Sequence, residues 1–127
     1  MSNKSAVKKL PVRDEVATEN TWRLEDIFAV DEQWEKEFNE VKGLIPSVQE
    51  YQGKLGESAE QLYSALQLQD KLLERLGRLY TYAHMRYDQD TTNSFYQGLD
   101  DRIKKPLIFF SSTARISGTM KASALAA

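Results

Sequence analysis

The single histidine of this chain, His84, is the residue best suited to chemistry, and Asp88 follows it by one helical turn. Such a pair could orient an imidazole for proton transfer, or it could supply two ligands of a metal site. The spacing of the sequence places no third ligand beside the pair, and helices carry such pairs routinely. We therefore interpret His84 and Asp88 as a hydrogen-bonded pair at the surface rather than as catalytic or metal-binding residues.

A second polar cluster begins at Asp88 and hints at a calcium-binding loop. Such a loop needs a glycine at its sixth position and a glutamate at its twelfth, where this chain has Asn93 and Leu99. The chain also has no His-Glu-x-x-His, no glycine-rich phosphate loop and no Gly-x-Ser-x-Gly. The sequence therefore predicts no catalytic, cofactor-binding or metal-ligating residue, and no cofactor bound by this chain itself.

Composition narrows the class of protein further. A chain of 127 residues with 41% hydrophobic residues is typical of one ordinary domain. The chain has no cysteine, which excludes disulfides and fits a reducing compartment, so we expect a cytoplasmic location. We expect no membrane span and no secretion signal, because no apolar run approaches the ~20 residues that a span needs. All 19 acidic residues lie at or before Asp101, which argues against a nucleic-acid partner.

The elements that must position these residues are organised around residues 58 to 88. Apolar side chains repeat there at alternating intervals of four and three, which predicts a helix of roughly 45 Å. This seam consists of Leu62, Leu66, Leu73, Leu76, Tyr80, Ala83 and Tyr87, with Gln69 in one polar slot. A second stripe lies one residue back, at Ala65, Leu68, Leu72, Leu79 and Tyr82. Two adjacent stripes predict packing against two or more elements. We expect the tyrosines here to serve mainly in packing.

Residues 31 to 49 predict an earlier helix with the same period. We expect Asp31 to cap it and Pro46 to kink or break it near residues 43 to 46. Its inward side chains would be Trp34, Phe38, Val41, Ile45 and Val48. Ser58 and Gln61 form a capping box for the following helix. The connection between the two helices is short, so they are predicted to form an antiparallel hairpin.

A third, partial helix is predicted after Thr92 or Asn93, with Tyr96, Leu99 and Ile103 facing inward and Pro106 ending it. Residues 1–20 are expected to form a flexible arm and residues 106–127 a disordered tail. Between the arm and the first helix, Trp22, Leu24, Ile27 and Phe28 predict a hydrophobic plug; a partner-binding motif is the alternative. The predicted fold is therefore all-α, with the helical region at residues 21–105.

Three segments carry a resemblance to a known family: Thr21–Phe28, Tyr51–Leu55 and Arg78–Asn93. Their order and spacing resemble the amino-terminal region of oligoendopeptidase F-like zinc metallopeptidases, over about residues 10 to 104. The resemblance implies a mostly helical, intracellular enzyme that cleaves short peptides inside a deep channel. It also implies zinc held by a His-Glu-x-x-His helix and a further glutamate, none of which can be placed on this chain.

Two functions follow as expectations. The first is an amino-terminal fragment of such a peptidase, whose helices wall the substrate channel; a truncated, frameshifted or remnant reading frame would explain why the resemblance ends after about Lys104. The second is an independent helical interaction module. The partners expected are the missing catalytic domain or a second copy of the chain, because Leu68, Leu72, Leu79 and Tyr82 would be exposed without partner helices. Alternatively, the third helix and the plug cover this stripe.

Overall fold

Three long helices make up most of the molecule. The computed structural model describes residues 8–126, with side chains described through residue 112. The helices are α1 (Asp31–Gln49), α2 (Ala59–Gln89) and α3 (Ser94–Ala126). Three short 3-10 helices precede them: η1 (Arg13–Glu15), η2 (Thr18–Asn20) and η3 (Leu24–Asp26). No strand occurs in the described part of the chain, so the prediction of an all-α fold is confirmed.

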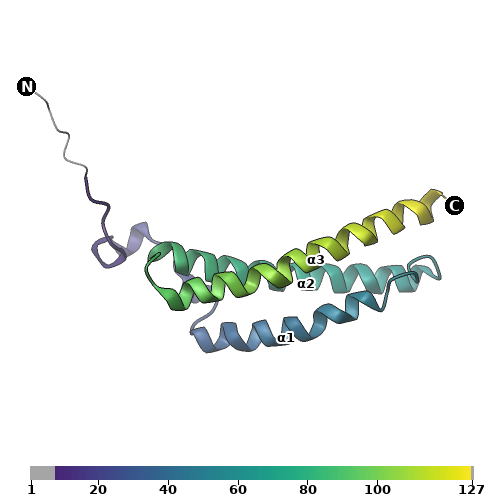
Figure 1. Ribbon diagram of the computed structural model, residues 1–127, viewed down its shortest axis with the longest axis horizontal. Coiled ribbons are helices and arrows are strands. Elements are labelled where there is room, and N and C mark those ends of the chain that lie inside the picture. Colours follow the sequence, from purple (N-terminus) through teal and green to yellow (C-terminus); the bar gives the residue numbers. More distant parts are fainter. Residues whose placement is uncertain (1–7, 127) are drawn as a thin grey trace, which may run out of the picture.

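The contacts between helices fix their directions. Trp34 near the start of α1 bonds to Leu79 in the second half of α2, and Glu37 pairs with Arg75, so these helices are antiparallel as the hairpin required. His84 of α2 contacts Asp100 of α3. The helix α3 runs antiparallel to α2 (Figure 1). Figure 1 shows the result, an up-down-up arrangement in which α1 and α3 point the same way. The loop between α1 and α2 contains Gly53 at a φ of 76°, a conformation that favours glycine.

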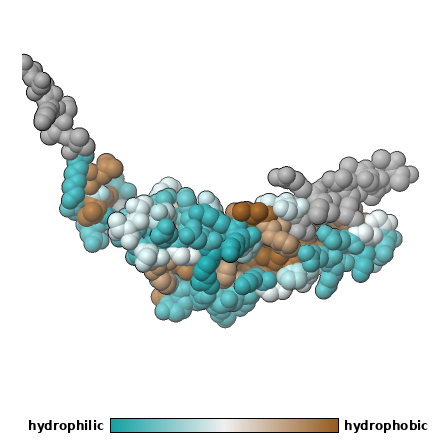
Figure 2. Space-filling model, in the orientation of Figure 1, coloured by the Kyte–Doolittle hydropathy of each residue, from teal (hydrophilic) through white to brown (hydrophobic). Residues whose placement is uncertain are grey.

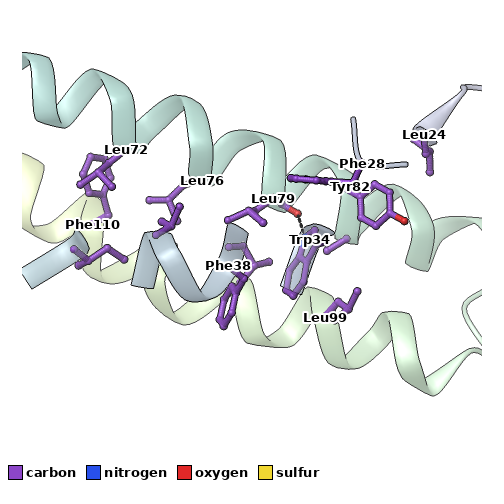
Figure 3. Close-up of a cluster of buried hydrophobic side chains, with 14 residues drawn as sticks. Leu24, Phe28, Trp34, Phe38, Leu72, Leu76, Leu79, Tyr82, Leu99 and Phe110 are labelled. Carbon is purple, nitrogen blue, oxygen red and sulfur yellow. Dashed lines mark hydrogen bonds between the residues drawn. The ribbon is translucent and has the colours of Figure 1, made fainter. Parts of the chain in front are cut away.

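The hydrophobic core lies along the middle of α2, where both other helices meet it. Figure 3 shows the side chains of all three helices converging there, with Leu24 and Phe28 closing one end. Four of the five predicted inward residues of α1 are buried, and so are Leu99 and Ile103 of α3. The helical period alone therefore identified the inner faces of α1 and α3 correctly.

The inner face of α2 differs from the predicted seam. The buried residues are Leu72, Leu76, Leu79, Tyr82 and Ala83, which come mostly from the second stripe. Leu73 of the predicted seam is 55% exposed, so its assignment to the hairpin interior was wrong. The expectation that Leu72, Leu79 and Tyr82 would be exposed was also wrong, because α3 and the Leu24–Phe28 region cover them.

Two of the three predicted helix caps are correct. The hydroxyl of Ser58 accepts a 3.1 Å hydrogen bond from the amide of Gln61, and the Oδ1 of Asn93 accepts from the amides of Phe95 and Tyr96. Asp31 is not a cap. Val30 occupies that position without a side-chain bond, and Asp31 is the first residue of α1. Its carboxylate is instead used between helices, as described below.

The two prolines do not end their helices. α1 continues unbroken through Pro46 to Gln49, and α3 continues through Pro106 to Ala126, so the predictions of a break and of a partial third helix were wrong. Proline fits helical φ but lacks the amide that bonds to residue i−4, so it removes one bond without forbidding the helix. Beyond Pro106, Phe110 is only 3% exposed, and this burial favours continuation of α3. α3 therefore includes residues 106–126, the stretch for which the sequence predicted a disordered tail.

The segment before α1 docks only in part. Leu24 and Phe28 are buried and Ile27 is half-buried, as the predicted plug required, but Trp22 is 76% exposed. Residues 8–20 carry the turns η1 and η2, and residues 1–7 of the predicted arm lie outside the described residues. Among the described helices, none is both long enough and apolar enough to cross a membrane.

Candidate functional site

Charged and aromatic side chains gather at the end of the bundle where the loop before α1 meets α2. Arg86 of α2 reaches the carboxylate of Glu25 at 3.0 Å, and Arg78 donates a 3.0 Å hydrogen bond to the carbonyl of Ile27. Phe28 meets the ring of Tyr82 edge-on, with centroids 5.4 Å apart. Two segments that carry the family resemblance, Thr21–Phe28 and Arg78–Asn93, therefore contact each other directly. Their shared role in this chain is to fasten the loop to α2.

Asp31 lies at the centre of this end of the molecule. Its two carboxylate oxygens accept hydrogen bonds from the hydroxyls of Tyr82, at 2.7 Å, and Tyr96, at 3.1 Å. These tyrosines belong to α2 and α3, so one carboxylate of α1 connects all three helices. The guanidinium of Arg86 lies over both tyrosine rings, 5.2 and 5.8 Å from their centroids. Cation–π attraction adds to the hydrogen bonds and keeps the rings in place.

The tyrosines at this junction hold their protons firmly. Burial raises the pKa of Tyr82 to about 12, and the hydrogen bond to Asp31 adds to the shift, while Arg86 opposes it. Burial and the charge of Asp31 likewise raise the pKa of Tyr96. General acid–base catalysis works best when the pKa of the group lies near the working pH. At neutral pH these phenols are structural hydrogen-bond donors and poor proton-transfer groups.

His84 lies on the α2–α3 interface and joins more partners than its sequence neighbours indicated. Its Nδ1 lies 3.0 Å from the Oδ1 of Asp100, and its Nε2 lies 3.6 Å from Asp88. Asp100 is 2% exposed, and its second oxygen is 2.7 Å from the ammonium of Lys104. Burial would raise the pKa of Asp100, but hydrogen bonds from Lys104 and His84 outweigh it and hold the pKa below its ordinary value.

This cluster does not fit a zinc ion. A catalytic zinc site needs three protein ligands and an open position. Here both imidazole nitrogens face carboxylates, and the ammonium of Lys104 already neutralises Asp100, so it would repel a metal cation. In the part of the chain that the structure describes, no group of three or more His, Cys, Asp or Glu residues is arranged to hold a metal ion.

Sequence reasoning found some of these residues and missed others. The contact between His84 and Asp88 was expected, whereas Asp100 lies sixteen residues away and carries no local signal. Asp31 was noticed as a cap but not as the acceptor for two tyrosines. Arg86 follows Tyr82 by one helical turn, a spacing that allows a cation–π contact. Its contact with Tyr96 depends on the fold, because Tyr96 belongs to α3. The described residues thus form a helical scaffold with a polar junction at one end.

Comparison with known proteins relates this scaffold to peptidases. The chain is 63% identical over 102 residues to the oligopeptidase PepF of Bacillus subtilis, a region that covers 80% of this chain and 15% of that protein. It is 33% identical over 101 residues to the group B oligopeptidase PepB of Streptococcus agalactiae, covering 17% of it. It is 35% identical over 86 residues to an oligoendopeptidase F homologue of Lactococcus lactis, covering 14% of it. No protein-family model and no solved structure matches the chain.

The resemblance inferred from the three segments is therefore confirmed. Four-fifths of this chain is related in sequence to a short part of oligoendopeptidase F-like proteins. The chain spans about one sixth of the length of these curated relatives. Their names describe oligopeptidases.

Proposed function

We propose that this chain forms the amino-terminal helical part of an oligoendopeptidase F-like zinc metalloendopeptidase that cleaves short peptides in the cytoplasm. The observation that carries the proposal is the 63% identity over 102 residues to the Bacillus oligopeptidase. At this level of identity, the matched four-fifths of the chain has a direct counterpart in a longer peptidase.

The role of the helices in such an enzyme is to build and brace the wall of the substrate channel. The polar junction at Asp31 suits this role, because it ties three helices together through the hydroxyls of Tyr82 and Tyr96, whose pKa values are raised above the ordinary value. Peptide hydrolysis and the zinc ion that it requires are assigned to residues other than those described here. The His84 cluster is assigned to fastening α3 onto α2.

A segment exchange tests the proposal. In the Bacillus oligopeptidase, the segment that this chain matches is replaced by the aligned residues of this chain. The exchanged enzyme should hydrolyse a quenched fluorescent peptide at a rate within about tenfold of the parent, since 63% of the matched residues are identical. A matched exchange that carries Leu76→Asp should be inactive, because it buries an unpaired charge in the core. Failure of the unmodified exchange, with the parent active, would refute the proposal.

A second candidate function is a non-enzymatic helical interaction module. It is favoured by the burial of Leu72, Leu79 and Tyr82 within the chain itself, which allows the three helices to share a core without another domain. Sedimentation and urea unfolding of the pure protein separate the two candidates. A compact monomer that unfolds cooperatively supports the module, whereas a chain that self-associates at micromolar concentration supports the peptidase fragment.

A further inference from the structure

Large apolar side chains reach the surface on both α2 and α3. Figure 2 shows hydrophobic residues gathered at the surface in the middle of one face of the molecule. On α3, Ile108 is 67% exposed, but it lies past about Lys104, where the resemblance to the peptidases ends. On α2, Leu73 is 55% exposed and lies well before that point. The surface of α2 is therefore the one that bears on the whole peptidase.

The whole of α2 belongs to the region shared with the Bacillus oligopeptidase. That region spans 102 of the 127 residues of this chain, so it can begin no later than residue 26 and end no earlier than residue 102. Every position of α2 falls between these limits. The exposed side of α2 therefore has an aligned counterpart in the longer peptidase.

A row of side chains outside the core follows the four-three repeat of α2. This row, the outer stripe, consists of Leu62, Leu66, Gln69, Leu73, Gly77 and Tyr80. Its positions fall within an arc of about 80° around the helix. The core uses the neighbouring positions of Leu72, Leu76 and Leu79 instead. A four-three repeat is the spacing by which one helix packs on another, so the outer stripe is a helix face that largely lacks a partner in the described part of the chain.

Gly77 marks the point of the outer stripe that another helix can approach most closely. A Cβ at this position would meet no atom within 4 Å, so no close contact among the described residues requires a glycine here. A glycine inside a helix costs about 1 kcal/mol relative to alanine. Leu73 and Tyr80 lie about one turn before and after it on the same side of α2. The space between these two side chains can receive a large side chain from a neighbouring helix.

Two carboxylates border the outer stripe next to Leu73. Asp70 and Glu74 are both exposed and lie one helical turn apart. Among the described residues, neither is in an ion pair, and Arg78, one turn after Glu74, donates its hydrogen bond to the carbonyl of Ile27. Like charges at this spacing repel each other and weaken a helix slightly. Basic side chains on a neighbouring helix would pair with them and remove this repulsion.

We propose that an amphipathic helix from the remainder of the peptidase packs on the outer stripe of α2, with basic residues beside Asp70 and Glu74. The inference rests on the proposed function and adds to it the surface through which the helical part joins the rest of the enzyme. The shared region covers 15% of the Bacillus protein, so most of that protein lies outside it and can supply the helix. The outer stripe is then open in the isolated chain and covered in the whole peptidase.

Thiol labelling tests the inference independently of catalysis, because the chain has no cysteine of its own. Leu73→Cys is introduced into the isolated chain, diluted until sedimentation shows a monomer, and into the Bacillus oligopeptidase that carries this chain's segment. The labelling rate at position 73, followed by mass spectrometry of the peptide that contains it, should fall at least about tenfold in the exchanged enzyme. The reason is that a docked helix must move away before the thiol reacts.

Lys71→Cys is the matched control for this experiment. Lys71 is exposed and lies about 160° around α2 from Leu73, so a helix on the outer stripe does not reach it. Its labelling rate should differ by less than about twofold between the isolated chain and the exchanged enzyme. Equal protection of positions 71 and 73 would overturn the inference, because α2 would then be enclosed on all sides rather than covered along one stripe.

A second set of variants tests the charge argument. Asp70→Lys combined with Glu74→Lys should lower the melting temperature of the exchanged enzyme and leave that of the isolated chain unchanged, because only the enzyme loses pairs with basic residues. Lys71→Glu, on the far side of α2, should lower neither. An unchanged melting temperature of the exchanged enzyme would refute the basic residues of the proposed helix.

The remaining outcomes separate this inference from the proposed function. Equal labelling at position 73 in chain and enzyme would overturn the inference even if peptide hydrolysis is normal. Protection that is lost when the exchanged enzyme is diluted would also overturn it, because a second copy would then be the occupant. Loss of hydrolysis with position 73 still protected would refute only the proposed function.

Discussion

The indole nitrogen of Trp34 in α1 donates a 2.9 Å hydrogen bond to the backbone carbonyl of Leu79, deep in the second half of α2. Figure 3 shows this bond as a dashed line inside the apolar cluster. Trp34 is fully buried, and its ring stacks on Phe38 with centroids 5.0 Å apart. A buried indole needs a partner for its N–H, so this bond fixes how α1 is positioned along α2.

Replacement of Trp34 should therefore be far more harmful than replacement of the other tryptophan. Trp34→Phe removes the donor and part of the buried ring, and it should lower the free energy of unfolding by about 1–3 kcal/mol. Trp22→Phe is the matched control and should change it by less than ~0.5 kcal/mol, because Trp22 is 76% exposed. Urea unfolding followed by circular dichroism measures both, and similar losses would contradict the placement of Trp34.

Two leucines three residues apart on α2 test which face of the helix is buried. Leu76 is completely buried, whereas Leu73 is 55% exposed. Leu76→Ala should lower the free energy of unfolding by about 2–5 kcal/mol, since it leaves a cavity between helices. Leu73→Ala should change it by less than ~1 kcal/mol. If the two variants were equally unstable, Leu73 would be buried as well, as the four-three repeat predicted.

Alkaline pH should weaken the fold through Tyr82. Its folded pKa of about 12 lies above the ordinary value of 10, so the unfolded chain releases this proton first as the pH rises. The free energy of unfolding should therefore fall between about pH 10 and pH 12. Asp31→Ala should reduce this fall, because it removes the hydrogen bond that helps to raise the pKa.

Glu32→Ala is the control for this experiment, because Glu32 also lies in the first turn of α1 and carries the same charge. The absorbance of phenolate, recorded during a pH titration of the folded protein, reports the tyrosines directly. If Asp31→Ala left the titration of the most resistant tyrosine unchanged, the bond between Asp31 and Tyr82 would not be the cause of its shift.

Acid should weaken the contact between α2 and α3 through Asp100. The pKa of this buried carboxyl is lower in the folded protein than in the unfolded chain. Its stabilising contribution is therefore present above about pH 4 and is lost as the pH falls through the folded pKa. Asp100→Asn should lower stability at neutral pH and flatten the dependence on acid. Asp101→Asn, which changes an exposed neighbour, should keep the dependence of the unmodified chain in urea unfolding at a series of pH values.

The sequence allowed the fold to be predicted where the pattern was local. The repeat from Trp34 to Ile45 defined the inner face of α1, and Ser58 marked the start of α2 by a bond to a residue three positions away. The face of α2 was harder, because this helix contacts α1, α3 and the loop at Phe28 at once. Its apolar arc is wide, and only the positions of its neighbours decide that Leu72 is buried and Leu73 is not.

The candidate site was less accessible to sequence reasoning because its bonds join distant residues. Tyr96 lies sixty-five positions from Asp31, and no spacing rule connects them. The prediction that Pro106 ends the third helix was wrong for a different reason. A proline inside a helix costs about 3 kcal/mol or more, and burial of residues further along α3, such as Phe110, can offset that loss.

The same prolines give the two outer helices a common weak point. Pro46 and Pro106 line one groove, so α1 and α3 each lack an amide donor at the same level of the bundle. The carbonyls of Lys42 and Arg102, one turn earlier, receive no bond from position i+4. Opening either helix at its proline therefore breaks one backbone bond fewer than opening it at a neighbouring position. Amide hydrogens beyond the prolines should exchange with solvent through local fluctuations, while those around Leu79 exchange only when the whole bundle unfolds.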